Sequence, residues 1–184
     1  LVLARTTTFG LLEPLTSRYR DSSGVDIPLP ERFFAGGAAS HRGFPENQAG
    51  PRDLVTGFPI GGDTILMNGL ELRFPLIGQN LGGVLFHDAG NVYENLGKIS
   101  FRVRQQDDTD FNYMVHAVGF GFRYQTPIGP FRVDLAYTLN PTTFFGFQGT
   151  RQELLDLILQ GQPLPLQRQS VGNFQFHFSL GQSF

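Results

Sequence analysis

Residues 119–139 read GFGFRYQTPIGPFRVDLAYTL, and this stretch decides the fold. Before its centre, Phe120, Phe122 and Tyr124 alternate with small or charged residues, and the same alternation resumes at Phe131. A period of two residues is that of a β-strand, whose successive side chains point to opposite faces. The Pro and Gly residues between the two runs are typical of a tight turn. The stretch therefore predicts two antiparallel strands joined by a short connection.

The same alternation predicts further strands on both sides of this pair. The clearest is the terminal strand, about residues 172–184, in which Phe178 shares a face with the Phe residues two and four positions before it. Other runs cover residues 1–12, 68–74 and 82–93. Together these patterns predict an all-β chain, an antiparallel meander of about six strands.

The predicted connections alternate between short and long. Short Pro/Gly turns join two of the strand pairs, whereas residues 13–63 and 141–170 form long connections, the second with a helical pattern in TRQELLDLILQ. Short turns at one end and long loops at the other are typical of an outer-membrane β-barrel. A soluble β-sandwich shows the same alternation with its apolar face inward, so the strand pattern alone leaves that alternative open.

Composition narrows the possible classes of protein. The chain has 184 residues, with 19 Phe and no Trp. Its net charge of −2 disfavours nucleic acid as a partner, and the absence of Cys excludes disulfides. No apolar run approaches the roughly 18 residues of a membrane helix. The opening LVLARTTTFG lacks the pattern of a signal peptide. It reads like the middle of a domain, so we expect an internal or C-terminal piece of a longer protein.

The sequence carries no pattern of an enzyme or a metal site. Its four His residues fall on four separate segments, without the H-x-x-x-H spacing of a metal site, and no G-x-S-x-G motif occurs. His87 and Asp88 are adjacent in a predicted strand, so they should point to opposite faces. We therefore expect no catalytic residue, metal or cofactor.

Arg42 stands at the centre of the Gly- and Pro-containing stretch ASHRGFPENQAG, residues 39–50. A guanidinium group inside a barrel needs an acceptor, because an unpaired buried charge is costly. Glu71 and Asp88 lie on the predicted inner face of adjacent strands. We expect residues 31–53 to fold inward so that Arg42 docks on Asp88 with Glu71 near. A solvated loop charge is the alternative.

Three neighbours of these residues have expected supporting roles. Gly43 would let the loop tip turn tightly, Phe44 would pack the tip against the wall, and Gly90 would permit a close approach of backbones. Protection of the loop from proteases would then depend on Arg42, because an undocked tip is accessible to a protease.

Several motifs, in order along nearly the whole chain, carry a family likeness. LPERFFAGGAASHRGF resembles the long loop of the BamA/TamA-type barrels, the bacterial surface antigen family of the eighty-five-kilodalton outer-membrane protein superfamily. That loop has a [VI]-R-G-[FY] tip, matched here by Arg42, Gly43 and Phe44, whereas His41 departs from the usual aliphatic residue.

The other motifs resemble strands of the same family. FHDAGNVY resembles its F-x-D-x-G strand, with Phe86, Asp88 and Gly90, and the 119–137 segment resembles G-x-G-x-R-x-x-T-P-x-G-P-x-R-x-D. FHFSLGQSF resembles the terminal strand, in which Phe184 would be the assembly signal and Gly181 would loosen the seam. The resemblance implies the last six strands of a sixteen-stranded transmembrane barrel, without its N-terminal strands and periplasmic POTRA modules.

The resemblance also implies a function. It points to a bacterial outer-membrane factor that inserts and folds nascent β-barrel proteins without catalysis, through lateral opening and strand templating. Outer-membrane lipids, nascent β-barrel proteins and accessory assembly lipoproteins are the expected partners. The alternative within the same superfamily is a protein-translocating secretion pore or channel plugged by the long loop.

Overall fold

Six strands form one sheet in a computed structural model that describes residues 1–14, 27–78, 80–126 and 129–180. Each pair of neighbours is antiparallel, in the order β1-β2-β3-β4-β5-β8. The strands of the sheet are β1 (Val2–Leu11), β2 (Thr64–Ile77), β3 (Leu81–Tyr93), β4 (Val115–Thr126), β5 (Gly129–Thr138) and β8 (Phe174–Leu180). The predicted antiparallel meander is confirmed.

The stretch that opened the sequence analysis forms β4 and β5. Phe122 pairs with Val133, so the apolar positions of the two strands face the same side. β2 extends well beyond the predicted 68–74. Its N-terminal half packs against the long loop, and the consecutive apolar residues 65–67 interrupt the alternation there.

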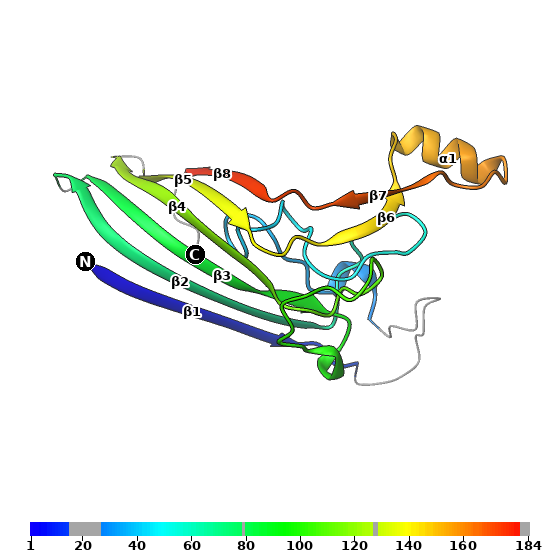
Figure 1. The fold of residues 1–184 in the computed structure, drawn as a ribbon, viewed down its shortest axis with the longest axis horizontal. Helices are drawn as coiled ribbons and strands as arrows, with labels where there is room; N and C mark the ends of the chain where they lie inside the picture. Colours follow the sequence, from blue (N-terminus) through cyan, green and yellow to red (C-terminus); the bar gives the residue numbers. More distant parts are fainter. Residues whose placement is uncertain (15–26, 79, 127–128, 181–184) are drawn as a thin grey trace.

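The connection between β5 and β8 holds more structure than the sequence predicted. We expected a short helix there, and α1 (Arg151–Leu159) forms with a capping box of Thr150 and Glu153. The structure adds a separate hairpin of β6 (Thr143–Phe147) and β7 (Leu166–Ser170), which projects with α1 beyond the sheet (Figure 1). Two short 3-10 helices lie at Leu29–Glu31 and Leu96–Lys98. No helix in the described part of the chain is both long and apolar enough to cross a membrane.

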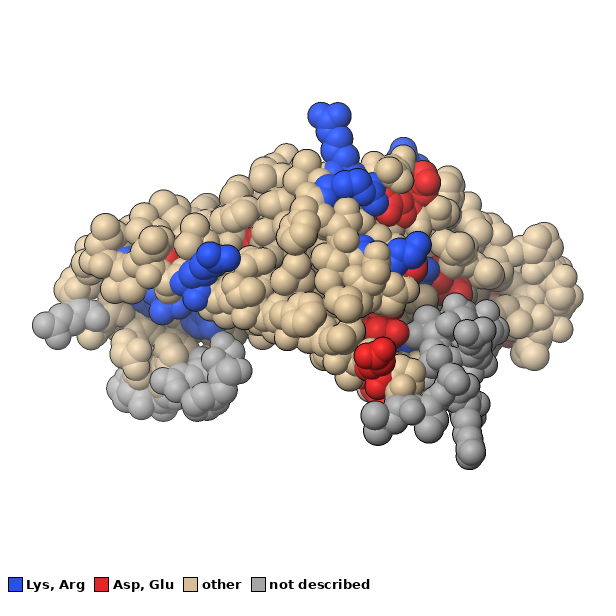
Figure 2. Space-filling view, turned by 90° about the horizontal axis from the view of Figure 1, so that it is seen from below, with Lys and Arg blue, Asp and Glu red and all other residues tan. Residues whose placement is uncertain are grey.

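The two faces of the sheet differ in chemistry. On the outer face of β8, Phe174, Phe176 and Phe178 are 68%, 66% and 56% exposed. On the inner face, Val84 and Phe86 of β3 are buried. Seen from below, most of the surface belongs to side chains other than Lys, Arg, Asp and Glu (Figure 2). An outer wall rich in exposed Phe is suited to contact with lipid.

Residues 27–63, the described part of the long connection between β1 and β2, lie on the concave side of the sheet. In Figure 1 they run between β1–β3 below and β5 and β8 above. Phe44 of this loop belongs to the main buried cluster, together with Met67 and Val92 of the sheet. The core is therefore built largely between the loop and the inner wall.

Candidate functional site

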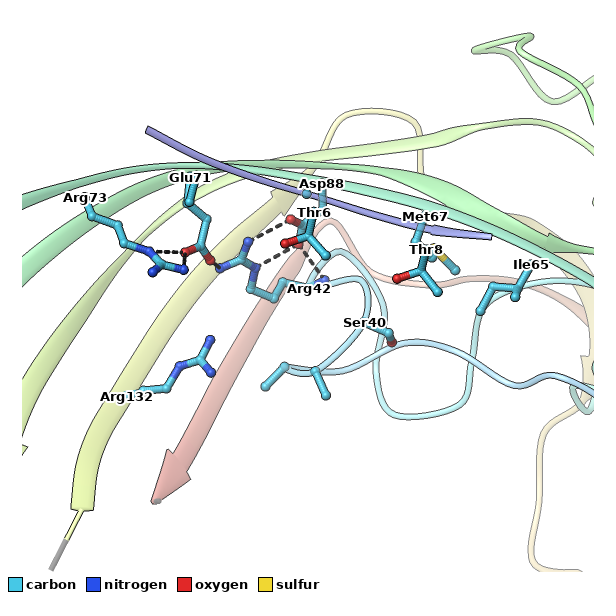
Figure 3. A pocket seen from close by; sticks show the side chains of 14 residues that line it. Thr6, Thr8, Ser40, Arg42, Ile65, Met67, Glu71, Arg73, Asp88 and Arg132 are labelled. Atoms are coloured by element: carbon cyan, nitrogen blue, oxygen red, sulfur yellow. Dashed lines mark hydrogen bonds and ion pairs between the residues drawn. The ribbon is translucent and has the colours of Figure 1, made fainter. Parts of the chain in front are cut away.

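Arg42 contacts two carboxylates of the inner wall (Figure 3). Its Nε and Nη2 atoms donate to the two oxygens of Asp88 at 2.8 and 2.7 Å, and its Nη1 atom donates to Glu71 at 2.7 Å. The backbone N–H of Arg42 donates to Asp88 as well, at 2.9 Å. A guanidinium group is suited to this arrangement because its planar donors can serve two carboxylates at once.

The charges of this cluster balance. Arg42 and Asp88 have side chains only 6% and 4% exposed, and Glu71 is 13% exposed. Glu71 also pairs with Arg73, whose side chain is 56% exposed, at 2.7 Å. Two cations thus meet two anions, which limits the cost of removing these groups from water.

Aromatic rings fix the position of the loop tip. The guanidinium carbon of Arg42 lies 3.5 Å from the centre of the Phe86 ring, a cation–π contact. Phe44 is 1% exposed, and its ring meets His41 edge to face at 5.0 Å. Phe86 of β3 therefore contacts the tip from the wall, and Phe44 anchors the tip in the buried cluster.

Gly43 and Gly90 both stand where the neighbouring atoms leave no room for a side chain. A Cβ atom on Gly43 would lie 2.7 Å from the Cβ of Ala117 and 2.9 Å from Oγ1 of Thr138. Gly43 is not among the residues with positive φ, so close approach rather than a left-handed turn explains this glycine. Gly90 has φ +154°, and its added Cβ would collide with the carbonyl oxygen of Leu66.

His41 is a site residue whose contacts the sequence did not predict. Its Nδ1 atom accepts from the N–H of Gly43 at 3.1 Å, and its Nε2 atom donates to the carbonyl of Val115 at 3.0 Å. Both bonds form together only when the ring is neutral and protonated at Nε2. His41 lies in the loop, outside the strands, and its complete burial lowers its pKa, while Asp88 opposes and Arg42 adds to this shift.

Acidification should therefore weaken docking of the tip. The contribution of neutral His41 is complete above its ordinary pKa of 6.5 and is lost as the pH falls toward the lower pKa of the docked state. Loop cleavage by a protease, measured from about pH 7.5 down to about pH 5.5, should rise by at most about tenfold per pH unit. His41→Gln cannot titrate, so its cleavage rate should stay flat; an equal rise in that variant would contradict the role of His41.

Two further residues hold the backbone of the tip. Thr138 of β5 donates to the carbonyl of Gly43 at 2.7 Å, and the Nε2 atom of His177 on β8 lies 2.8 Å from the carbonyl oxygen of Arg42. Alternation placed both side chains on the inner face but could not show what they contact on the concave side of the sheet. With these bonds, and the bond of His41 to Val115 of β4, the tip contacts β2, β3, β4, β5 and β8.

Arg52 supports the part of the loop that returns toward β2. Its guanidinium group bonds the carbonyls of Gly57 and Gln48 and lies 4.0 Å from the centre of the Phe144 ring. Burial lowers its pKa to about 10. Apart from its place next to Pro51, no pattern in the sequence marks this residue.

The remaining candidate residues fall in different places. Phe178 lies on the outer face of β8, where its ring contacts Phe131 at 4.8 Å. Gly181 and Phe184 lie outside the described residues. His87 bonds His116 at 3.1 Å, away from Asp88, as their opposite faces require. Within the described ranges, no group of three or more His, Asp or Glu side chains is placed to hold a metal ion.

A cavity of about 400 Å³ opens beside the Arg42 cluster. Arg42, Glu71 and Asp88 line it together with Thr6 of β1 and Arg132 of β5 (Figure 3). The docked tip therefore borders a polar space on the inner side of the sheet. Such a space suits the wet lumen of a barrel.

The chain belongs to the Omp85 superfamily, whose domain model matches residues 1–184. This membership places it in the bacterial outer membrane. The structural likeness supports the fold: the crystal structure of BamA from Haemophilus ducreyi lacking POTRA domains 1-3 matches 95% of this chain with a TM-score of 0.51 and 21% identity.

Two curated relatives, like the solved structure, are named BamA. The outer membrane protein assembly factor BamA of Nitratidesulfovibrio vulgaris is 31% identical over 118 residues, which is 62% of this chain and 14% of that protein. BamA of Neorickettsia risticii is 27% identical over 120 residues, 64% of this chain and 15% of that protein. The chain also covers 33% of the solved BamA chain, so it spans only a small part of these relatives.

Proposed function

We propose that this chain is the C-terminal part of a sixteen-stranded barrel that inserts and folds outer-membrane proteins without enzymatic chemistry. The observation that carries the proposal is the edge of β8. Among the described residues β8 pairs with β5 along one edge, and in the proposed full-length barrel its other edge meets the first strand at a seam that can open. An open edge can template an incoming strand by β-augmentation.

In this proposal the barrel opens laterally between its first strand and β8. Nascent β-barrel proteins would pair with β8, while the Phe side chains of its outer face contact membrane lipid. Accessory lipoproteins would bind elsewhere on the full-length protein. The two curated relatives are named as outer membrane protein assembly factors, which supports this class over others.

A secretion pore of the same superfamily is the second candidate. The observation in its favour is the position of the loop, which lies on the concave side of the sheet and buries Phe44 there. A loop in that place could act as a plug. In that case the loop closes a channel and β8 remains paired.

Reconstitution tests the choice between these functions. The full-length protein in lipid vesicles should speed the folding of an added, unfolded β-barrel client, and deletion of residues 31–53 should abolish this gain. Deletion of α1 is the matched control and should have little effect, because α1 projects beyond the sheet. If deletion of residues 31–53 instead raises conductance sharply and leaves client folding intact, the protein is a pore.

A further inference from the structure

The terminal strand β8 contacts the loop tip through His177. Its Nε2 atom lies 2.8 Å from the carbonyl oxygen of Arg42, 135 positions away in the sequence. A carbonyl oxygen only accepts, so Nε2 carries the proton and donates. This bond is formed by the backbone of the same residue whose side chain binds Asp88.

This bond joins elements that the sheet does not join directly. β8 pairs with β5 from Phe174 to Leu180, and His177 stands in the middle of that register opposite Asp134. Arg42 is fixed to Asp88 on β3, which is separated from β8 by β4 and β5. The path from His177 through Arg42 to Asp88 therefore spans the concave side of the sheet.

We propose that His177 is a positioning residue that couples docking of the loop tip to retention of β8 in the wall. The proposal rests on the proposed function, in which β8 borders the lateral opening. While Arg42 stays on Asp88, its carbonyl holds His177 and resists displacement of β8. When the tip leaves, β8 keeps its pairing with β5 but loses the bond of His177, so it separates from the wall more readily.

Amide hydrogen exchange of β8 in the full-length protein in lipid vesicles tests this coupling. His177→Phe keeps a ring but removes the donor, and it should speed exchange of the β8 amides by about fivefold, the effect of one lost hydrogen bond. His177→Gln retains a donor of similar reach and should restore slow exchange. Unchanged exchange in His177→Phe would overturn the proposal.

Gln175 provides the matched control. It lies on the same face of β8, two residues from His177, and its side-chain amide bonds the carbonyl of Gly172 next to the strand. Gln175→Ala should therefore leave exchange at the wild-type rate. An equal rise in Gln175→Ala and His177→Phe would show general loosening of β8 and would also overturn the proposal.

A double-mutant cycle tests the coupling itself. Arg42→Ala should speed β8 exchange in the wild-type background, because the tip that holds His177 is released. The same change should add little in the His177→Phe background, where the link is already broken. Fully additive effects would mean that the tip and β8 act independently, which would overturn the coupling.

These measurements need no client protein, so they separate the two proposals. If β8 responds as expected but the wild-type protein does not speed client folding, the coupling stands and the assembly function fails. If clients fold faster but the exchange of the β8 amides is unchanged in His177→Phe, the assembly function stands and the coupling fails.

Discussion

Replacing Arg42 with alanine should free the loop tip and lower the free energy of unfolding by about 3–5 kcal/mol. The substitution removes the cation that pairs with Asp88, whose side chain is 4% exposed. Glu71 keeps its ion pair with Arg73. Removing one member of a buried pair costs more than the pair contributes, because the remaining charge is desolvated and uncompensated.

Protease digestion and denaturant unfolding of the full-length protein measure this effect. Cleavage within residues 31–53 should become rapid in Arg42→Ala. The cleavage rate and the stability of Arg42→Lys should lie between those of Arg42→Ala and wild type. The reason is that an ammonium group cannot bond both oxygens of Asp88 and also reach Glu71. Equal protection of the loop in Arg42→Ala and wild type would refute docking through this residue.

Arg73→Ala is the matched control for Arg42→Ala. Arg73 pairs with the same Glu71 at a similar distance, but its side chain is 56% exposed. Exposed ion pairs contribute only about 0–1 kcal/mol, so this variant should keep its loop protected and its stability nearly unchanged. Both variants remove one positive charge, but only one of the two arginines is buried. Comparing their loss of stability therefore separates the effect of burial from the effect of charge.

Gly90→Ala should be the second severe change, costing about 3 kcal/mol or more. Gly90 has φ +154°, where L side chains are strained, and its Cβ would lie 2.8 Å from the Cα of Met67 as well as against the carbonyl of Leu66. Both neighbours are backbone atoms of β2, so relief requires separation of β2 from β3 next to Asp88.

Resistance to unfolding in detergent, followed on gels with increasing temperature, measures the effect of Gly90→Ala. Gly69→Ala is the control on the facing strand. The nearest heavy atom to its added Cβ is Oδ1 of Asp88 at 3.6 Å, an ordinary contact, so stability should change by less than about 1 kcal/mol. Similar behaviour of the two variants would show that space at Gly90 is not limiting.

Local patterning was enough to predict the sheet. The alternation around Phe120 and Phe131 depends only on neighbours in the chain, and it placed β4 and β5 and their common apolar face correctly. The β6–β7 hairpin escaped prediction because its strands are five residues each and α1 separates them. Five residues give too few alternations to stand out from a loop.

The site was predictable only where a motif marked it. Arg42, Asp88 and Glu71 were expected together, and the structure places their charged atoms 2.7 Å apart. The contacts of His41 and His177 were not predicted, because alternation fixes only the face of a strand residue and does not show which loop carbonyl lies opposite that face. Such contacts depend on how far the loop extends into the concave side of the sheet, and many side chains of the loop and the sheet set that position together.

The bonds of the tip also dictate an order of events as the chain folds. Arg42 meets Asp88, Gly43 meets Thr138 and Arg42 meets His177 over sequence separations of 46, 95 and 135 residues. Closing such large loops is slow and entropically costly until the intervening strands are in place. The full set of bonds can form only after β8 has reached the sheet, so its completion reports that β8 has taken its place beside the tip.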